Sequence, residues 1–149
     1  MSLWYQLRLA MPSRFEELEL VDSLMEALLG HVGCDQDERS NLALSVREAL
    51  ANAVLHGNRL AADKSVSLEV TLEMTLDAGE LRIQVSDEGA GFDPDAVPDP
   101  LAPENLLKPT GRGILLMRNF MDEVSFEFPN SGGTLVFMRK SLAARTPGP

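Results

Sequence analysis

The longest regular pattern in this sequence is a strict alternation of apolar and polar residues from Val66 to Leu76. Side chains on a β-strand point alternately to opposite faces, so the pattern predicts a long strand with one buried face. Asp77-Ala-Gly79 then predicts a turn, and Leu81 to Ser86 alternates in the same way up to Asp87. A half-buried pair of strands requires a second layer that covers its apolar face.

Two segments in the first third of the chain carry the pattern that opens a helix. Ser13-Arg-Phe-Glu16 is a capping box, and it predicts a helix that ends near Gly30. Asp35-Gln-Asp-Glu38 repeats this signature and predicts the start of a second helix. The second helix has a complete apolar face at helical spacing, formed by Leu42, Val46, Ala49, Leu50 and Ala53. We expect such helices to form the covering layer.

The remaining patterns extend the sheet. Leu3 to Leu9 alternates and predicts an opening strand, and a further helix is expected at about 112 to 121. Val124 to Phe128 and Thr134 to Met138 flank Pro129-Asn-Ser-Gly-Gly133 and predict a hairpin. Together the patterns predict a two-layer α/β sandwich, with a mixed, mostly antiparallel sheet and helices on one face.

Length and composition indicate a small cytoplasmic protein. The 149 residues predict one domain, expected to span residues 1–142, with a disordered tail at 143–149. A net charge of −10 opposes binding to a phosphate backbone, so no direct contact with nucleic acid is expected. The chain shows no apolar run long enough to cross a bilayer and no charged leader, so no membrane association is expected. The single cysteine, Cys34, agrees with a reducing compartment.

The second predicted helix carries a polar stripe opposite its apolar face. Glu48, Asn52 and His56 are four residues apart, and side chains at that spacing project from the same side of an α-helix. A surface helix ordinarily fills its polar side with lysine, glutamate and arginine, whereas this stripe holds one acid, an amide and a histidine. This composition favours a lined pocket. The alternative is a solvated face with a histidine hydrogen-bonded near the helix end.

Two glycine-containing segments follow. Asp87-Glu-Gly89-Ala-Gly91-Phe92 begins at a strand end, where its glycines let the backbone approach another group closely. Thr110-Gly111-Arg112-Gly113 precedes an apolar helix pattern, and bare N–H groups at a helix start favour anions. The alternatives are an ordinary glycine turn and a helix weakened by about 1 kcal/mol per glycine. The order of the stripe and these two segments favours a phosphate-bearing ligand.

These three segments resemble the motifs of the GHKL ATPases, the family that includes gyrase B, heat-shock chaperones, MutL and histidine kinases. Glu48 to Gly57 is similar to the N-box, Asp87 to Phe92 to the first glycine box, and Gly111 to Gly113 to the second. The resemblance covers about residues 5 to 140. It implies the Bergerat-type ATP-binding fold, with ATP and Mg²⁺ as the expected cofactors.

Within that family the chain most resembles the stand-alone anti-sigma-factor serine/threonine kinases. The likeness extends from Gly113 to Val124 and to Gly132-Gly133-Thr134. It implies an ATP-dependent anti-sigma factor that sequesters a sigma factor and phosphorylates a STAS-type antagonist of the anti-sigma factor. Relatives of this type are homodimers, and the strand from Leu3 to Leu9 would offer an exposed edge for pairing.

The resemblance also implies roles for the residues that hold the nucleotide. Asn52 would offer a carboxamide oxygen to Mg²⁺, a hard cation that prefers oxygen ligands and keeps several waters. Asp87 is the candidate acceptor for the adenine amino group, and the family implies that Thr134 shares a water-bridged contact to the same base. The backbone would approach the base or present N–H groups to the phosphates at Gly89, Gly91, Gly111 and Gly113.

Catalysis is assigned to Glu48, one helical turn from Asn52. It would orient an incoming hydroxyl and accept its proton late, as the bond to phosphorus forms. Arg112 would stabilise charge on the γ-phosphate or pair with a nearby acid. Residues 93–109 have no periodic pattern and occupy the place of the family's lid over the nucleotide. Lys108 in that segment would approach the phosphates when the lid closes, or remain solvated.

Three functions compete as explanations of these motifs. The favoured one is the anti-sigma-factor kinase. The catalytic half of a histidine kinase is disfavoured because no helical hairpin with heptads and a phosphoacceptor histidine precedes the domain, and His31 and His56 are wrongly placed. A non-enzymatic switch, in which ATP only selects the partner, is disfavoured by Glu48 because a pure switch needs no base.

Overall fold

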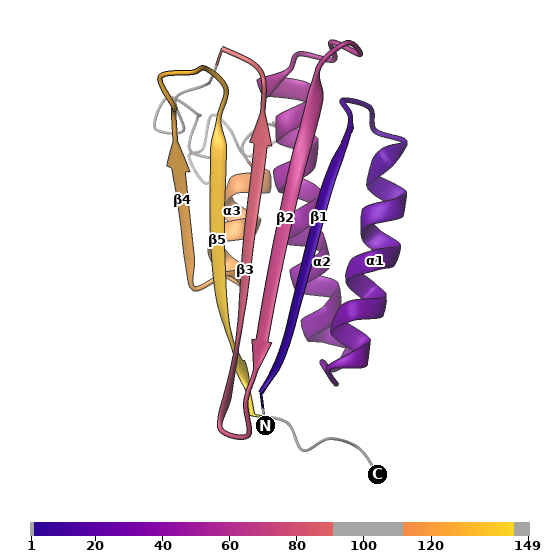
Figure 1. Ribbon diagram of the computed structural model, residues 1–149, viewed down its shortest axis with the longest axis vertical. Coiled ribbons are helices and arrows are strands. Elements are labelled where there is room, and N and C mark those ends of the chain that lie inside the picture. Colours follow the sequence, from indigo (N-terminus) through magenta and orange to yellow (C-terminus); the bar gives the residue numbers. More distant parts are fainter. Residues whose placement is uncertain (1, 91–111, 145–149) are drawn as a thin grey trace.

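The computed structural model describes residues 2–90 and 112–144, which form a sheet with helices packed on one side (Figure 1). The strands are β1 (Leu3–Pro12), β2 (Ser65–Met74), β3 (Ala78–Asp87), β4 (Glu123–Glu127) and β5 (Leu135–Ala143). The helices are α1 (Glu17–His31), α2 (Gln36–Asn52) and α3 (Arg112–Phe120), and a π-helical turn, η1 (Ala53–Gly57), continues α2. The predicted two-layer α/β sandwich is confirmed. β5 extends to Ala143, the first residue of the expected tail, and residues 145–149 lie outside the described residues.

The described strands form one five-stranded sheet in the order β1-β2-β3-β5-β4. Every strand pair in the described residues is antiparallel. β2 and β3 form the hairpin that the alternation predicted, with Val66 opposite Asp87 and Met74 opposite Gly79. The predicted C-terminal hairpin is also present, and its second strand, β5, lies between β4 and β3. β1 and β4 are therefore the edges of the sheet (Figure 1).

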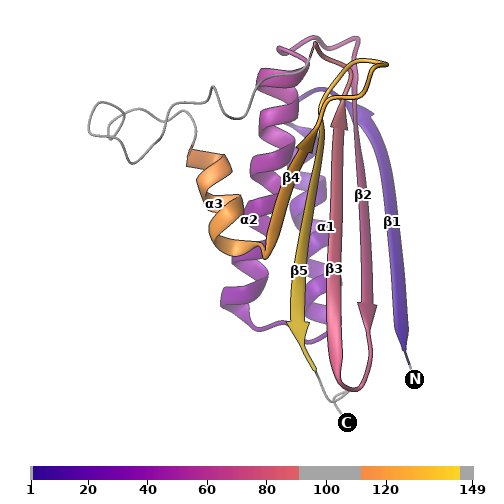
Figure 2. The same ribbon diagram turned by 90° about the vertical axis from the view of Figure 1, so that its left-hand side faces the viewer.

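The hydrophobic core lies between the sheet and the helices, which share one side of it (Figure 2). On β2 the apolar positions from Val66 to Met74 are buried, as the alternation predicts. The predicted apolar face of the second helix is also buried, from Leu42 on α2 to Ala53 at the start of η1. Leu76 was expected on the same buried face, but 66% of its surface is exposed because β2 ends at Met74 and a turn follows. No helix in the described ranges is long and apolar enough to cross a membrane.

The two predicted capping boxes have different outcomes. Asp35 caps α2, and its carboxylate accepts the N–H of Glu38 at 2.9 Å, as expected. The prediction for Ser13 is wrong, because α1 begins at Glu17 and its N-cap, Glu16, makes no side-chain capping bond. Ser13 instead prolongs the pairing of β1, donating its N–H to the carbonyl of Lys64 at 3.1 Å, and its side chain is buried. Tertiary contact with the start of β2 therefore overrides a local signal.

Candidate functional site

The predicted base-binding residues lie at the end of β3, where η1 packs against the loop that follows the strand. A Cβ atom on Gly57 would overlap the carboxylate of Asp87, and one on Gly89 would overlap the carbonyl of Gly57. Side chains at either position would separate η1 from the loop. Glycine is therefore required here for close backbone approach, which is the property expected of the first glycine box.

The carboxylate of Asp87 is buried and is oriented by backbone groups. Its Oδ1 accepts the N–H of Gly89 at 2.9 Å and the N–H of Thr134 at 3.2 Å. The Asp87 N–H donates to the Thr134 carbonyl at 3.1 Å, which ties β3 to the start of β5. Burial raises the pKa of Asp87, and the bonds from Gly89 and Thr134 and the charge of Lys64 oppose that rise. Within the described residues no donor uses Oδ2, so this oxygen retains its acceptor capacity.

The segment before β5 closes the other side of Asp87. Gly132 and Gly133 have φ values of +98° and +82°, and a Cβ atom on Gly133 would overlap the Asp87 carbonyl. The Gly133 N–H donates to the Gly89 carbonyl at 2.7 Å, so the two glycine segments are bonded to each other. Thr134 is 2% exposed, and its Oγ1 has no hydrogen-bond partner among the described residues. A buried, unpaired hydroxyl beside a carboxylate is typical of a site that receives a ligand or a water.

A second group of predicted residues meets where α2 packs against α3. Glu48 lies against the first turn of α3, and a Cβ atom on Gly113 would be 2.5 Å from its Oε2. Asn52 is half-buried one turn further along α2, and Arg112 is exposed at the start of α3. The fold thus brings the N-box acid to the second glycine box, as the motif order implies. Figure 2 shows α3 alongside α2 on the same side of the sheet.

The polar stripe on α2 was predicted to include His56, but in the structure it ends at Asn52. After Asn52 the chain widens into η1, in which the N–H of Asn58 donates to the carbonyl of Ala53 at 2.8 Å. Residues four apart no longer align across a π-turn, and His56 is exposed to solvent. Single π-turns inside helices occur frequently at functional sites, and this one delivers Gly57 to Asp87.

The described residues therefore contain most of the predicted site. Asp87, Gly89 and Thr134 lie together at the end of β3, and Glu48 lies against Gly113 at the α2–α3 contact. The predictions for Gly91, Gly111, Lys108 and the lid at 93–109 fall outside the described residues. The sequence reasoning missed Asn58, which is 1% exposed and bonded to Ser65 at the start of β2 and to Glu88 directly after β3. Its only local signal is an amide directly after the N-box glycine.

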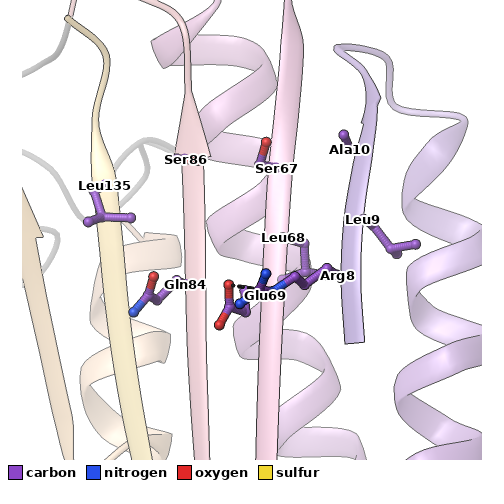
Figure 3. A pocket seen from close by; sticks show the side chains of 9 residues that line it. All are labelled: Arg8, Leu9, Ala10, Ser67, Leu68, Glu69, Gln84, Ser86 and Leu135. Atoms are coloured by element: carbon purple, nitrogen blue, oxygen red, sulfur yellow. Dashed lines mark ion pairs between the residues drawn. The ribbon is translucent and has the colours of Figure 1, made fainter. Parts of the chain in front are cut away.

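The open face of the sheet carries a separate hollow of about 400 Å³ (Figure 3). Glu69 lies at its centre, paired with Arg8 at 3.2 Å and accepting from the side chain of Gln6 at 3.0 Å. This hollow is on the side of the sheet opposite the helices, whereas Glu48 lies on α2. The described residues hold no cluster of three or more His, Cys, Asp or Glu suited to a metal. Mg²⁺ held through one amide and phosphate oxygens does not require such a cluster.

Comparison with known proteins decides the family. The histidine kinase-like ATPase domain family matches this chain over residues 11–140. The chain belongs to this family. The resemblance inferred from the three motifs is thereby confirmed, and the match extends from the end of β1 into β5.

Curated relatives and solved structures agree with this assignment. The chain is 31% identical over 142 residues to the anti-sigma F factor of Geobacillus kaustophilus, covering 93% of each chain. It is 34% identical over 108 residues to the anti-sigma F factor of Priestia megaterium, covering 71% of each. The RsbU and RsbW domains of Rv1364c from Mycobacterium tuberculosis superpose with a TM-score of 0.62 at 16% identity, over 95% of this chain and 33% of that one. A chain of the SiaB–SiaC complex from Pseudomonas aeruginosa gives a TM-score of 0.61 at 14% identity, over 91% and 88%. These two likenesses concern the fold.

Proposed function

We propose that this protein is an ATP-dependent anti-sigma factor with protein-serine/threonine kinase activity. It sequesters a sigma factor and phosphorylates a STAS-type antagonist of the anti-sigma factor. The observation that carries the proposal is the contact between Glu48 and Gly113, which puts a carboxylate beside the helix start expected to hold the phosphates. The similarity to anti-sigma F factors over most of both chains supports the choice of partners.

The adenine end fits the base of ATP. The Asp87 Oδ2 is available to accept the exocyclic amino group, and the unpaired Thr134 Oγ1 is available for a water shared with the same base. Gly89 and Gly133 keep side chains out of this space, because a Cβ atom at either position would overlap backbone. A buried carboxylate with a free oxygen is a pure acceptor, which is the chemistry that an amino group requires.

The phosphate end fits a role in phosphoryl transfer. Asn52 would hold Mg²⁺ through its carboxamide oxygen, and the bound cation would neutralise charge on the phosphates. Glu48 orients the incoming serine or threonine hydroxyl and accepts its proton as the bond to phosphorus forms. Arg112, at the start of α3, would stabilise negative charge at the same end. Most of the catalysis in such a transfer consists of positioning and charge stabilisation.

The proposal is tested by capture followed by labelling. The tagged protein is used to capture partners from the native host lysate with and without ADP, and the partners are identified by mass spectrometry. Any captured STAS protein is then incubated with the kinase, Mg²⁺ and γ-labelled ATP. We expect a sigma factor and a STAS protein among the partners, and acid-stable label on the STAS protein. Acid-labile label would instead indicate a histidine phosphate, and binding without label would indicate the non-enzymatic switch.

We also propose that the protein is a cytoplasmic homodimer that pairs through β1. This strand is 10 residues long and lies at the sheet edge, and Trp4 near its start is 59% exposed. A long uncovered edge strand readily pairs with another strand, and a second copy would extend the sheet. Light scattering at micromolar concentration should return twice the chain mass of 16.3 kDa. A mass near that of one chain would contradict the dimer.

A further inference from the structure

Behind the base-binding loop, three residues from three separate segments form a closed ring of hydrogen bonds. Asn58, directly after η1, donates from Nδ2 to the carbonyl of Ser65 at the start of β2, at 2.9 Å. Its Oδ1 accepts the N–H of Glu88 at 2.9 Å. The Glu88 carboxylate completes the ring by accepting the N–H and the Oγ–H of Ser65, both at 3.0 Å. Each of the three residues is thus bonded to the other two.

The ring is anchored on a buried amide. Asn58 is 1% exposed, so removal of its side chain would take away the protein partner of the Glu88 N–H and of the Ser65 carbonyl, in bonds that are part-buried. The bonds from Ser65 and the charge of Lys64 lower the pKa of Glu88, so its carboxylate remains ionised at neutral pH. The carbonyl of Lys64 also accepts the N–H of Ser13, which links the end of β1 to the same place.

The ring lies directly beside the contact between Gly57 and Asp87, which defines the base end of the site. Asn58 directly follows Gly57, and Glu88 directly follows Asp87, so the bond between Asn58 and Glu88 joins the two segments that meet at the carboxylate. On the other side, Asp87 is oriented by Gly89 and Thr134. The backbone at Asp87 is therefore held from both sides, and the ring adds side-chain bonds to its pairing with Val66 on β2.

We propose that Asn58 is a positioning residue for base recognition: through its ring with Glu88 and Ser65 it sets where the Asp87 carboxylate meets the base. It thereby determines how strongly the site prefers a base with an exocyclic amino group over one with a carbonyl at that place. This inference rests on the proposed nucleotide site. A site built to hydrogen-bond a polar group discriminates strongly only while its own groups are held within about 0.5 Å of the productive geometry.

The experiment measures discrimination rather than affinity alone. ADP and inosine diphosphate differ at the position that faces Asp87. The dissociation constant of inosine diphosphate divided by that of ADP, both measured by calorimetry, therefore reports base recognition. We expect Asn58→Ala to lower this ratio at least about tenfold. Thr75→Ala is the matched control, because Thr75 Oγ1 donates to the Ala78 carbonyl at 2.9 Å and accepts the Ala78 N–H at 3.1 Å at the opposite end of the same hairpin. That variant should lose stability without changing the ratio.

The outcomes separate the ring from the nucleotide site itself. If Asn58→Ala lowers the melting temperature but keeps the wild-type ratio, Asn58 is only structural and the inference is overturned. If the wild type binds the two nucleotides equally or not at all, the proposed nucleotide site fails as well. Should Asn58→Ala not fold, Glu88→Ala removes two of the four bonds from an exposed side chain. A ratio reduced about threefold or more supports the ring, and an unchanged ratio overturns it.

Discussion

The two ends of the candidate site are built from different kinds of groups. At the base end, Asp87 is fixed by the backbone N–H groups of Gly89 and Thr134, and glycines bring the surrounding segments into contact. At the phosphate end, the expected groups are two side chains, Glu48 as the proton acceptor and Asn52 as the metal ligand. Within the described residues neither of these two side chains makes a hydrogen bond, although both are half-buried on α2.

This difference corresponds to two kinds of chemistry. Reading the edge of a rigid base requires an acceptor at a fixed place, and backbone contacts provide this without the entropy cost of ordering a long side chain. A metal ligand and a proton acceptor need unused lone pairs that become engaged only with the reacting groups. Almost any substitution at the base end is therefore expected to weaken nucleotide binding. At the phosphate end, substitution of one residue should affect binding and substitution of the other should affect the rate of phosphate transfer.

The largest effect is expected at the base end. Asp87→Asn preserves shape, and its Oδ1 can still accept the N–H groups of Gly89 and Thr134, but its amide N–H groups replace the acceptor proposed for the base. We expect the affinity for ADP to fall about 10³-fold, or about 4 kcal/mol. Calorimetry with ADP measures this directly. An unchanged affinity would mean that the base is recognised elsewhere.

The next effect is expected in rate rather than affinity. Glu48→Gln keeps size and hydrogen-bonding reach and removes the proton acceptor. General-base contributions are about 10²–10⁴-fold, or about 2.7–5.4 kcal/mol of barrier. We therefore expect normal binding of ATP and partner, with phosphate transfer to the STAS antagonist slowed at least about a hundredfold. Equal rates in the variant and the wild type would remove the base from Glu48 and favour the non-enzymatic switch.

Asn52→Ala provides the contrasting variant on the same helix. It should weaken the binding of ATP in the presence of Mg²⁺, because it removes the proposed metal ligand. Binding of ADP in the presence of a chelator should remain as in the wild type. Loss of binding in both conditions would place Asn52 in the structure of α2 and not at the metal.

The sequence predicted those features that depend on neighbouring residues. The alternation from Val66 to Met74 and the Asp35 cap are local patterns, and both are present in the structure. Ser13 failed as a cap because the carbonyl of Lys64, distant in sequence, binds its N–H. The stripe on α2 ends before His56 because Gly57 must reach Asp87, which a helical pattern cannot indicate. Long-range contacts thus decided the outcomes for Ser13 and His56, whereas Leu76 is exposed because β2 ends at Met74.

The rigidity of the base end can be measured at a single glycine. Gly133 and Gly33 have similar φ values of +82° and +84°, but a Cβ atom on Gly133 would also overlap the Asp87 carbonyl. A non-glycine residue in such a conformation costs about 1–3 kcal/mol. Denaturant unfolding should show that cost for Gly33→Ala, which lies at an exposed position, and a larger loss for Gly133→Ala. Equal losses in the free energy of unfolding would indicate that the backbone before β5 shifts at little cost to accommodate the added Cβ atom.

The smallest effect concerns pH and the stability of the ligand-free protein. Burial raises the pKa of Asp87 above its ordinary value, so the folded state disfavours the ionised carboxylate. The stability linked to a raised pKa is fully present below the unfolded value of about 3.9 and is lost as pH rises through the folded value. Asp87→Asn should therefore melt at an equal or higher temperature than the wild type at pH 7, with the difference shrinking as pH falls toward 4. If the variant is instead less stable at pH 7, and by the same amount at every pH, the carboxylate stabilises the fold. It would then not be a group that is kept for recognition although its burial lowers stability. The base end would then be rigid for structural reasons, and the contrast between the two ends of the site would disappear.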